Sequence, residues 1–168
     1  MPEMSQPARS DDVERYLARA VDLAVANVAE GGGPFGAVVV LPDGRTFEGQ
    51  NRVTRDNDPT AHAEVVAIRG AAAAAGFDLT GAALYASCEP CPLCLAAALW
   101  ARIGSVHYAA DRHDAAAVGF DDAAFYEYFD AGSGGHGEHS LLPIIRTQMP
   151  TQGRPFTAWT EFEGRVEY

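Results

Sequence analysis

Four residues in the middle of the chain have the types and spacing of a metal-dependent hydrolytic site: His62, Glu64, Cys91 and Cys94. Zinc at a catalytic site takes three protein ligands and keeps a fourth position open for water. One imidazole and two thiolates make such a set, and the two thiolates neutralise the charge of the ion. The pKa of a zinc-bound water falls from about 15.7 to about 7, which makes a nucleophile available near neutral pH.

Glu64 is surplus to this ligand set, and a carboxylate there can move protons. It can take the proton of the water and deliver it first to a ring nitrogen and then to a leaving amine. The pattern therefore predicts hydrolytic deamination with one zinc ion per chain, with Glu64 as the catalytic carboxylate.

The alternative interpretation is a structural zinc site or a thiol-redox motif built on Cys91 and Cys94. A structural site needs a fourth ligand at short spacing, and the sequence offers none. Cys88 is too close to Cys91 to form a second such pair, and we expect it to be a buried structural residue. Together with His62 upstream, this favours the catalytic interpretation.

The expected ligand His62 and the expected catalytic residue Glu64 both fall at a predicted helix start. Asp-Pro precedes Thr60, which is predicted to cap an alanine-rich helix over residues 61–76. His62 and Glu64 would then lie together in the first turn of that helix.

The two cysteines fall at a second predicted helix start. An apolar run over residues 82–86 predicts a buried strand, and Pro90 and Pro92 follow where a helix opens. Cys91 and Cys94 are three residues apart, so their sulfur atoms share one face of a helix that continues to residue 102. Two helix starts can therefore converge on one ion.

The remaining elements predict an α/β fold. An amphipathic helix over residues 10–30 is expected to bury a stripe made of Val13, Leu17, Ala20, Val21, Ala24 and Val28. Further elements are predicted at residues 35–41, 45–50, 104–110 and 141–148 (strands), 115–130 (a helix broken near residue 119) and 156–168 (a helix and tail). Strands joined by helices indicate a three-layer α/β/α sandwich with a central mixed sheet of about five strands.

The composition restricts the partners. The 168 residues carry 23 acidic and 12 basic side chains, a formal net charge of −11, and such a surface repels phosphates. We therefore expect a small neutral substrate and no nucleic acid. No apolar run approaches the length of a membrane span, and the N-terminus has no apolar signal region, so we expect no membrane partner and a cytoplasmic protein.

The motifs resemble those of a known superfamily. His62-Ala63-Glu64 followed by Pro90-Cys91-Pro92-Leu93-Cys94 is similar to the signature of the zinc cytidine-deaminase-like superfamily, to which the zinc-dependent base deaminases belong. The segments at residues 85–94, 100–102 and 115–122 and the terminal Glu-Tyr look like bacterial guanine deaminases of that fold. The similarity runs from about Phe35 to the C-terminus.

The resemblance implies several further site residues. Asp122 matches a family acid that contacts the base and assists proton transfer, and Asn51 matches a residue that hydrogen-bonds the base in purine-deaminating relatives. Phe35 and Trp100 match aromatic residues of the base pocket, and Ala63 is expected to contact the substrate. The residues themselves also fit simpler roles: Asp122 as a helix cap, Asn51 as a turn residue, and both aromatic side chains as core.

The resemblance further implies the reaction and the assembly. We expect deamination of guanine to xanthine and ammonia, with a nucleoside such as guanosine as the alternative substrate. The expected domains are a flexible N-terminus at residues 1–9, a zinc deaminase domain at residues 10–150 and a C-terminal segment at residues 151–168. Tyr168 matches a residue that closes the pocket of a partner subunit, so we expect a homodimer with exchanged tails; the alternative is a tail packed on its own subunit.

Overall fold

The computed structural model describes residues 10–130, 142, 146 and 148–167. They form the helices and strands α1 (Ser10–Ala29), β1 (Gly36–Val40), β2 (Thr46–Gln50), α2 (Val53–Asp56), α3 (Ala63–Ala75), β3 (Ala83–Cys88), α4 (Pro92–Trp100), β4 (Ser105–Ala110), α5 (Arg112–Ala117), α6 (Ala123–Asp130) and α7 (Arg154–Glu161). None of the described helices is long and apolar enough to cross a membrane.

The chain divides into two compact units, Met1–Asp122 and Ala123–Tyr168. The first unit contains the whole sheet and every predicted zinc and proton-transfer residue. In the second unit the described helices are α6 and α7. The domain boundary after residue 150 that the sequence suggested stays a prediction.

The sheet is mixed and has the strand order β2-β1-β3-β4. β1 runs antiparallel to both β2 and β3, whereas β3 and β4 are parallel because α4 connects them. Four strands are present in the described residues, one fewer than the sequence suggested. The predicted strand over residues 141–148 lies mostly outside the described residues.

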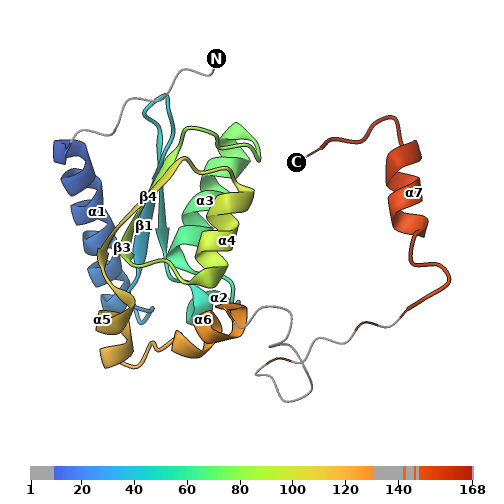
Figure 1. Cartoon of the computed structure of the whole chain (residues 1–168). Coiled ribbons are helices and arrows are strands. Elements are labelled where there is room, and N and C mark those ends of the chain that lie inside the picture. The colour runs from blue at the N-terminus through green and yellow to red at the C-terminus, as the bar shows by residue number, and fades with distance from the viewer. Residues whose placement is uncertain (1–9, 131–141, 143–145, 147, 168) are drawn as a thin grey trace. The chain divides into compact units, whose positions relative to one another are not determined.

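Helices cover both faces of the sheet and give the three layers that the sequence predicted (Figure 1). Alternate side chains of each strand point to opposite faces. Val39 and Leu84 belong to the core cluster shared with α3 and α4, whereas Val38 and Tyr85 pack against Ala20 and Leu23 of α1.

Helix α1 buries most of the expected stripe: Ala20 and Ala24 are buried and Val13 and Leu17 pack against the core, but Val21 and Val28 do not belong to it. Its buried residues are Ala20, Leu23, Ala24 and Asn27, whereas Val21, Val25 and Val28 are 40%, 66% and 52% exposed. Close packing explains the difference, because a Cβ on Gly36 of β1 would lie 2.7 Å from the backbone nitrogen of Ala24. Only the face with small side chains allows such an approach.

A second close approach positions α3. A Cβ on Gly49 of β2 would lie 2.7 Å from the backbone nitrogen of Ala67 and would overlap the Ala63 carbonyl. Glycine at this position therefore lets the first turns of α3 lie directly on the sheet. The start of α3, where the predicted metal ligand His62 lies, is fixed by this contact.

Candidate metal centre and active site

Two of the three predicted metal ligands occupy the N-cap positions of helices. His62 is the N-cap of α3 and Cys91 the N-cap of α4, both with extended backbone, and neither side chain caps its helix. Thr60, which the sequence predicted as the cap, instead donates its backbone N–H and its hydroxyl to Asp58 at 2.8 and 2.7 Å. The helix therefore begins two residues later than predicted, and the His62 side chain is free to ligate.

The three predicted ligands converge. His62 Nδ1 lies 3.5 Å from Cys91 Sγ and 3.5 Å from Cys94 Sγ, and the two sulfur atoms are 3.7 Å apart. Zn–S bonds of about 2.3 Å and Zn–N bonds of about 2.0 Å at tetrahedral angles require an S–S separation of about 3.8 Å and N–S separations of about 3.5 Å. The donor set and its spacing therefore fit one zinc ion with a fourth position left for water.

The electrostatics of this cluster favour thiolate ligands. The hydrogen bond between Cys94 and Cys91 lowers the pKa of Cys91 to about 4, and the neighbouring His62 adds to that effect. Hydrogen bonding to Cys91 raises the pKa of His62, and the shared proton raises the pKa of Cys94. A bound metal displaces that proton because a coordinating thiol is deprotonated.

Glu64 is the buried carboxylate of the site. It is the second residue of α3 and its side chain is only 7% exposed. Burial raises its pKa, and the negative charge of Cys91 adds to that effect. A raised pKa makes this carboxylate a stronger base, which suits the first step of general acid–base work.

Asp122 shares the electrostatic surroundings of the metal ligands. It is half-buried, and burial raises its pKa, with the negative charge of Cys91 as the second cause. Arg112 acts in the opposite direction. The structure thus brings the predicted substrate-contacting acid into the electrostatic range of Cys91.

Phe35 directly precedes β1 and Asn51 directly follows β2, so both residues lie at the open end of the hairpin. The Asn51 backbone N–H donates to the Phe35 carbonyl at 3.1 Å, which holds the two residues side by side. The Phe35 ring meets the Phe120 ring edge-to-face with centroids 4.9 Å apart. Asn51 is buried, and its Oδ1 accepts the backbone N–H of Val53 at 3.3 Å. Phe120 was not singled out from the sequence, where only its place near a helix break marked it.

Two predicted pocket residues lie differently from the others. Trp100 is the last residue of α4, at the opposite end from Cys91 and therefore roughly 13 Å along the helix. It is 68% exposed, so within one chain it neither joins the core nor reaches the metal cluster. The Ala63 side chain is fully buried in the core, so only its backbone can meet a substrate. Tyr168 lies outside the described residues.

Cys88 has the structural role that we expected. It is buried, and its Sγ donates to the Asp111 carbonyl at 3.4 Å. Burial raises its pKa to about 11, which makes it a poor ligand and nucleophile. In the described part of the chain, the one group of three metal-type ligands is His62, Cys91 and Cys94.

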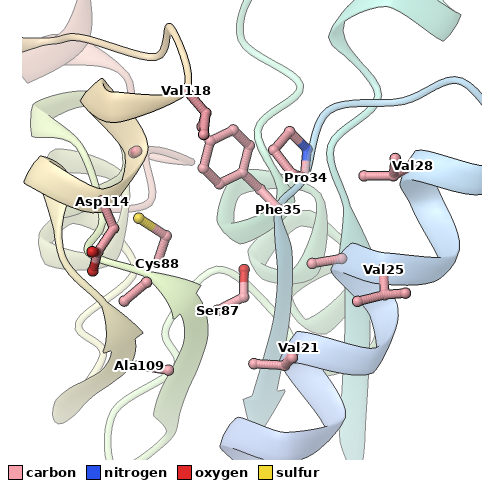
Figure 2. A pocket seen from close by; sticks show the side chains of 13 residues that line it. Val21, Val25, Val28, Pro34, Phe35, Ser87, Cys88, Ala109, Asp114 and Val118 are labelled. Atoms are coloured by element: carbon pink, nitrogen blue, oxygen red, sulfur yellow. The ribbon is translucent and has the colours of Figure 1, made fainter.

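An apolar groove of about 350 Å³ lies on the α1 side of the sheet, and Phe35 is among the residues that line it. Figure 2 shows Val21, Val25 and Val28 on one side of it and Asp114 and Val118 on the other. No metal ligand lines this groove, and neither does Glu64. The exposed valines of α1 therefore border a groove that is distinct from the metal centre.

Known proteins with the same features were found by sequence and by structure. The family described as the cytidine and deoxycytidylate deaminase zinc-binding region matches residues 10–110. Guanine deaminase from Bacillus subtilis (strain 168) is 47% identical over 92% of this chain and 98% of its own length. The X-ray structure of the Bacillus subtilis enzyme superposes with a TM-score of 0.85 over the same shares of the two chains.

More distant relatives act on other bases or share less of the fold. Guanine deaminase from Nitrosomonas europaea superposes with a TM-score of 0.61 at 33% identity, covering 71% of this chain and 69% of its own. The tRNA-specific adenosine deaminase of Haemophilus influenzae is 36% identical over 75% of this chain and 77% of its own length. The family match spans both predicted helix starts, and the chain therefore belongs to the zinc-dependent cytidine and deoxycytidylate deaminase family.

Proposed function

We infer that this chain hydrolyses guanine to xanthine and ammonia. The observation that carries the choice of base is the 47% identity to guanine deaminase of Bacillus subtilis over nearly the whole of both chains, with a TM-score of 0.85. The reaction type is supported independently by the spacing of the three ligands and the buried carboxylate beside them.

The chain contributes ligands and a proton carrier. His62, Cys91 and Cys94 would hold zinc, which when bound lowers the pKa of a water molecule enough to supply a nucleophile. Glu64 takes a proton from the water and delivers it to N3 of the ring as the C2–O bond forms. Glu64 then carries the proton of the new C2 hydroxyl to the exocyclic amine, so that the C2–N bond breaks, ammonia leaves and the C2 carbonyl of xanthine forms. The carboxylate ends the cycle as it began.

Substrate recognition falls to the residues around this carboxylate. An ionised Asp122 accepts hydrogen bonds from N1–H and from the exocyclic amine, a pair of donors that cytosine presents differently. Because the Oδ1 of Asn51 is held by Val53, its Nδ2 is the group that can donate to an acceptor on the purine. Phe35 supplies an aromatic wall braced by Phe120, and Ala63 offers its backbone N–H at the start of α3.

The charge of the chain supports a free base rather than a tRNA. The net charge of −11 disfavours phosphate binding. The basic residues of the loop between β2 and α3 are paired, since Arg52 lies 2.7 Å from Asp56 and Arg55 lies 2.9 Å from Glu30. Each guanidinium therefore faces a carboxylate, whose negative charge offsets the attraction of the guanidinium for a phosphate.

The test is a substrate panel with metal analysis. The zinc-loaded protein is incubated with guanine, guanosine, adenine and cytosine, and ammonia release and xanthine absorbance are followed. Guanine turnover that disappears in Glu64→Gln supports the proposal. Faster turnover of guanosine would identify a nucleoside deaminase instead, and a zinc-bound protein inactive on the panel would indicate the structural-zinc alternative.

We also propose that the working unit is a homodimer with exchanged C-terminal segments. In the second unit the aromatic residues Phe156, Trp159 and Phe162 are exposed, and aromatic surface of this kind favours association. Leu99 and Trp100 of α4 are also exposed, so the first unit likewise has apolar surface that favours association. The glycine-rich residues 132–140, which we expect to form the hinge of this exchange, lie outside the described residues, as does Tyr168. The cytoplasmic location stays a prediction.

Complementation tests the exchange. Protomers carrying Glu64→Gln are unfolded and refolded together with protomers lacking residues 164–168. Exchange predicts that activity returns in the mixed dimer, since intact tails then close pockets that still hold Glu64. A mixed dimer without activity, isolated by two affinity tags, would show that each tail serves its own subunit.

A further inference from the structure

We propose that Asn27, in helix α1, is a positioning residue that holds the substrate-binding Asn51 in place. The inference rests on the role of Asn51 proposed above. Asn27 lies on the opposite side of the sheet from α3 and α4, and none of its hydrogen bonds goes to a metal ligand. Its effect on the reaction would therefore be indirect, through the loop that follows β2.

Asn27 is a buried amide with both donor hydrogens in use. It is 0% exposed, and its Nδ2 donates to the carbonyls of Gly33 and Asn51, each at 2.8 Å. Gly33 precedes β1 and Asn51 follows β2, so one side chain ties together the two ends of the hairpin. A buried carbonyl that loses its hydrogen-bond donor destabilises the folded state, and few buried carbonyls in native proteins lack a partner.

The orientation of this amide is fixed from the other end. Its Oδ1 accepts from Arg55 Nη2 at 3.2 Å, and the same nitrogen lies 2.9 Å from Glu30. The oxygen thus faces a cation while the nitrogen faces two carbonyls, which only one orientation of the amide satisfies. A Cβ on Gly32 would overlap the Asn27 side chain, so the turn is packed tightly against it.

This network immobilises Asn51. Its N–H is held by the Phe35 carbonyl, its carbonyl by Asn27, and its Oδ1 by the Val53 N–H. Releasing the carbonyl would let the residue rotate and move its Nδ2 away from the base. Displacements of about 1 Å in a substrate-positioning group cost on the order of 10²-fold in rate. The fixed carbonyl is therefore what makes the Asn51 amide a reliable donor.

A double-mutant cycle distinguishes positioning from general stabilisation. Guanine kinetics are measured for the wild type, Asn27→Ser, Asn51→Ala and the double variant, each loaded with zinc. We expect Asn27→Ser to lower kcat/KM by about 10- to 100-fold. The loss should come chiefly from a higher KM, as expected when a contact made before the transition state is removed. In the Asn51→Ala background the same change should cost less than about twofold, because the group it positions is already gone.

Gln50→Leu is the matched control. Gln50 precedes Asn51, and its Nε2 donates to the Leu23 carbonyl at 3.0 Å, so this variant also removes a side-chain hydrogen bond between α1 and the β2 segment. It leaves the Asn51 carbonyl untouched, and we expect kcat/KM within about threefold of the wild type, well below the loss expected of Asn27→Ser. Zinc content should remain at one per chain in all variants.

Three outcomes would overturn the inference. The first is a double variant whose loss of kcat/KM equals the product of the losses of Asn27→Ser and Asn51→Ala. The second is an unchanged KM with kcat falling in step with the folded fraction, which marks a structural role. The third is an Asn51→Ala variant with normal kinetics, which removes the assigned role of Asn51 and this inference together. Guanine turnover by the wild type is read in the same experiment, so failure of the proposed function is seen separately. If Asn27→Ser does not fold, the near-isosteric Asn27→Asp, which replaces the donor by an acceptor, is measured against the same outcomes.

Discussion

Replacement of Glu64 by glutamine separates proton transfer from every other function of the site. The side chain is 7% exposed on the first turn of α3, two residues after His62. Glutamine has nearly the same shape, so the packing of the turn and the positions of the ligands should persist. The amide cannot accept and release a proton at neutral pH, so only the proton carrier is lost.

The expected size of the effect follows from that loss. General acid–base catalysis contributes about 10²- to 10⁴-fold, which corresponds to about 2.7–5.4 kcal/mol of activation free energy. Burial raises the pKa of Glu64, which strengthens this carboxylate as the base that takes the proton of the water, and we expect the loss to fall within this range. The loss should lie in kcat, since the carboxylate serves proton transfer rather than substrate binding.

Steady-state kinetics and metal analysis on the same samples provide the assay. Glu89→Gln is the matched control, because Glu89 lies two residues before Cys91 as Glu64 lies two after His62. Glu89 accepts the backbone N–H of Arg112 at 3.0 Å, which a glutamine oxygen can also do. The Glu89→Gln enzyme should deaminate guanine at a rate within a few-fold of that of the wild type. A Glu64→Gln enzyme with a full zinc complement and turnover close to that of the wild type would refute the assignment.

Three further predictions concern the metal and the stability of the fold. Cys91→Ala should lose the zinc. A ligand at a hundredfold excess over its Kd stabilises the folded state by about 2.7 kcal/mol, or about 5–10 °C in Tm, and this stabilisation should be lost with the metal. An unchanged zinc content by mass spectrometry would remove Cys91 from the ligand set. Cys88→Ser should keep one zinc per chain, since Cys88 Sγ bonds the Asp111 carbonyl, and metal loss would contradict our ligand set. Glu48→Gln should destabilise the protein by less than about 1 kcal/mol at pH 7, because Glu48 is part of an exposed pair with Arg19. Arg19 holds the pKa of Glu48 below 4.5, so this difference is present above pH 4.5 and should vanish as the pH falls through the lowered pKa; a difference that persists at low pH in denaturant titrations would exclude the ion pair as its cause.

Local sequence signals predicted that the three metal-type ligands come together, because the prediction depended on short-range patterns in the sequence. His62, Cys91 and Cys94 come from two helix starts, and the helices were predicted from alanine content and from Pro92. The exact start of α3 was wrong because the side chain of Asp58 competes for the Thr60 N–H and hydroxyl. Competition between turn and cap hydrogen bonds depends on the three-dimensional path of the loop.

Residues whose roles depend on long-range contacts were beyond sequence reasoning. Asn27 continues the pattern of buried positions on α1, but its structural role is to donate hydrogen bonds to two carbonyls that are 6 and 24 residues away in sequence. A signal was present, since a polar residue at the spacing of the buried Ala20, Leu23 and Ala24 must find buried partners. The role of Trp100 stays a prediction, because its apolar side chain does not indicate whether its own chain or another chain covers it.

The use of two N-cap positions for metal ligation has a measurable cost in the metal-free protein. Side chains such as Asp111, which accepts the backbone N–H groups of His113 and Asp114, stabilise the start of α5, whereas His62 and Cys91 leave α3 and α4 without such a bond. Good capping residues contribute about 1 kcal/mol. In excess chelator, Cys91→Ser should therefore be more stable than Cys91→Ala by about 0.5–2 kcal/mol in denaturant unfolding, because serine caps α4 and alanine does not. Neither variant should bind zinc with the affinity of the parent. Equal stability of the two metal-free variants would show that the start of α4 is held by packing alone, and that ligation at this position costs the fold nothing.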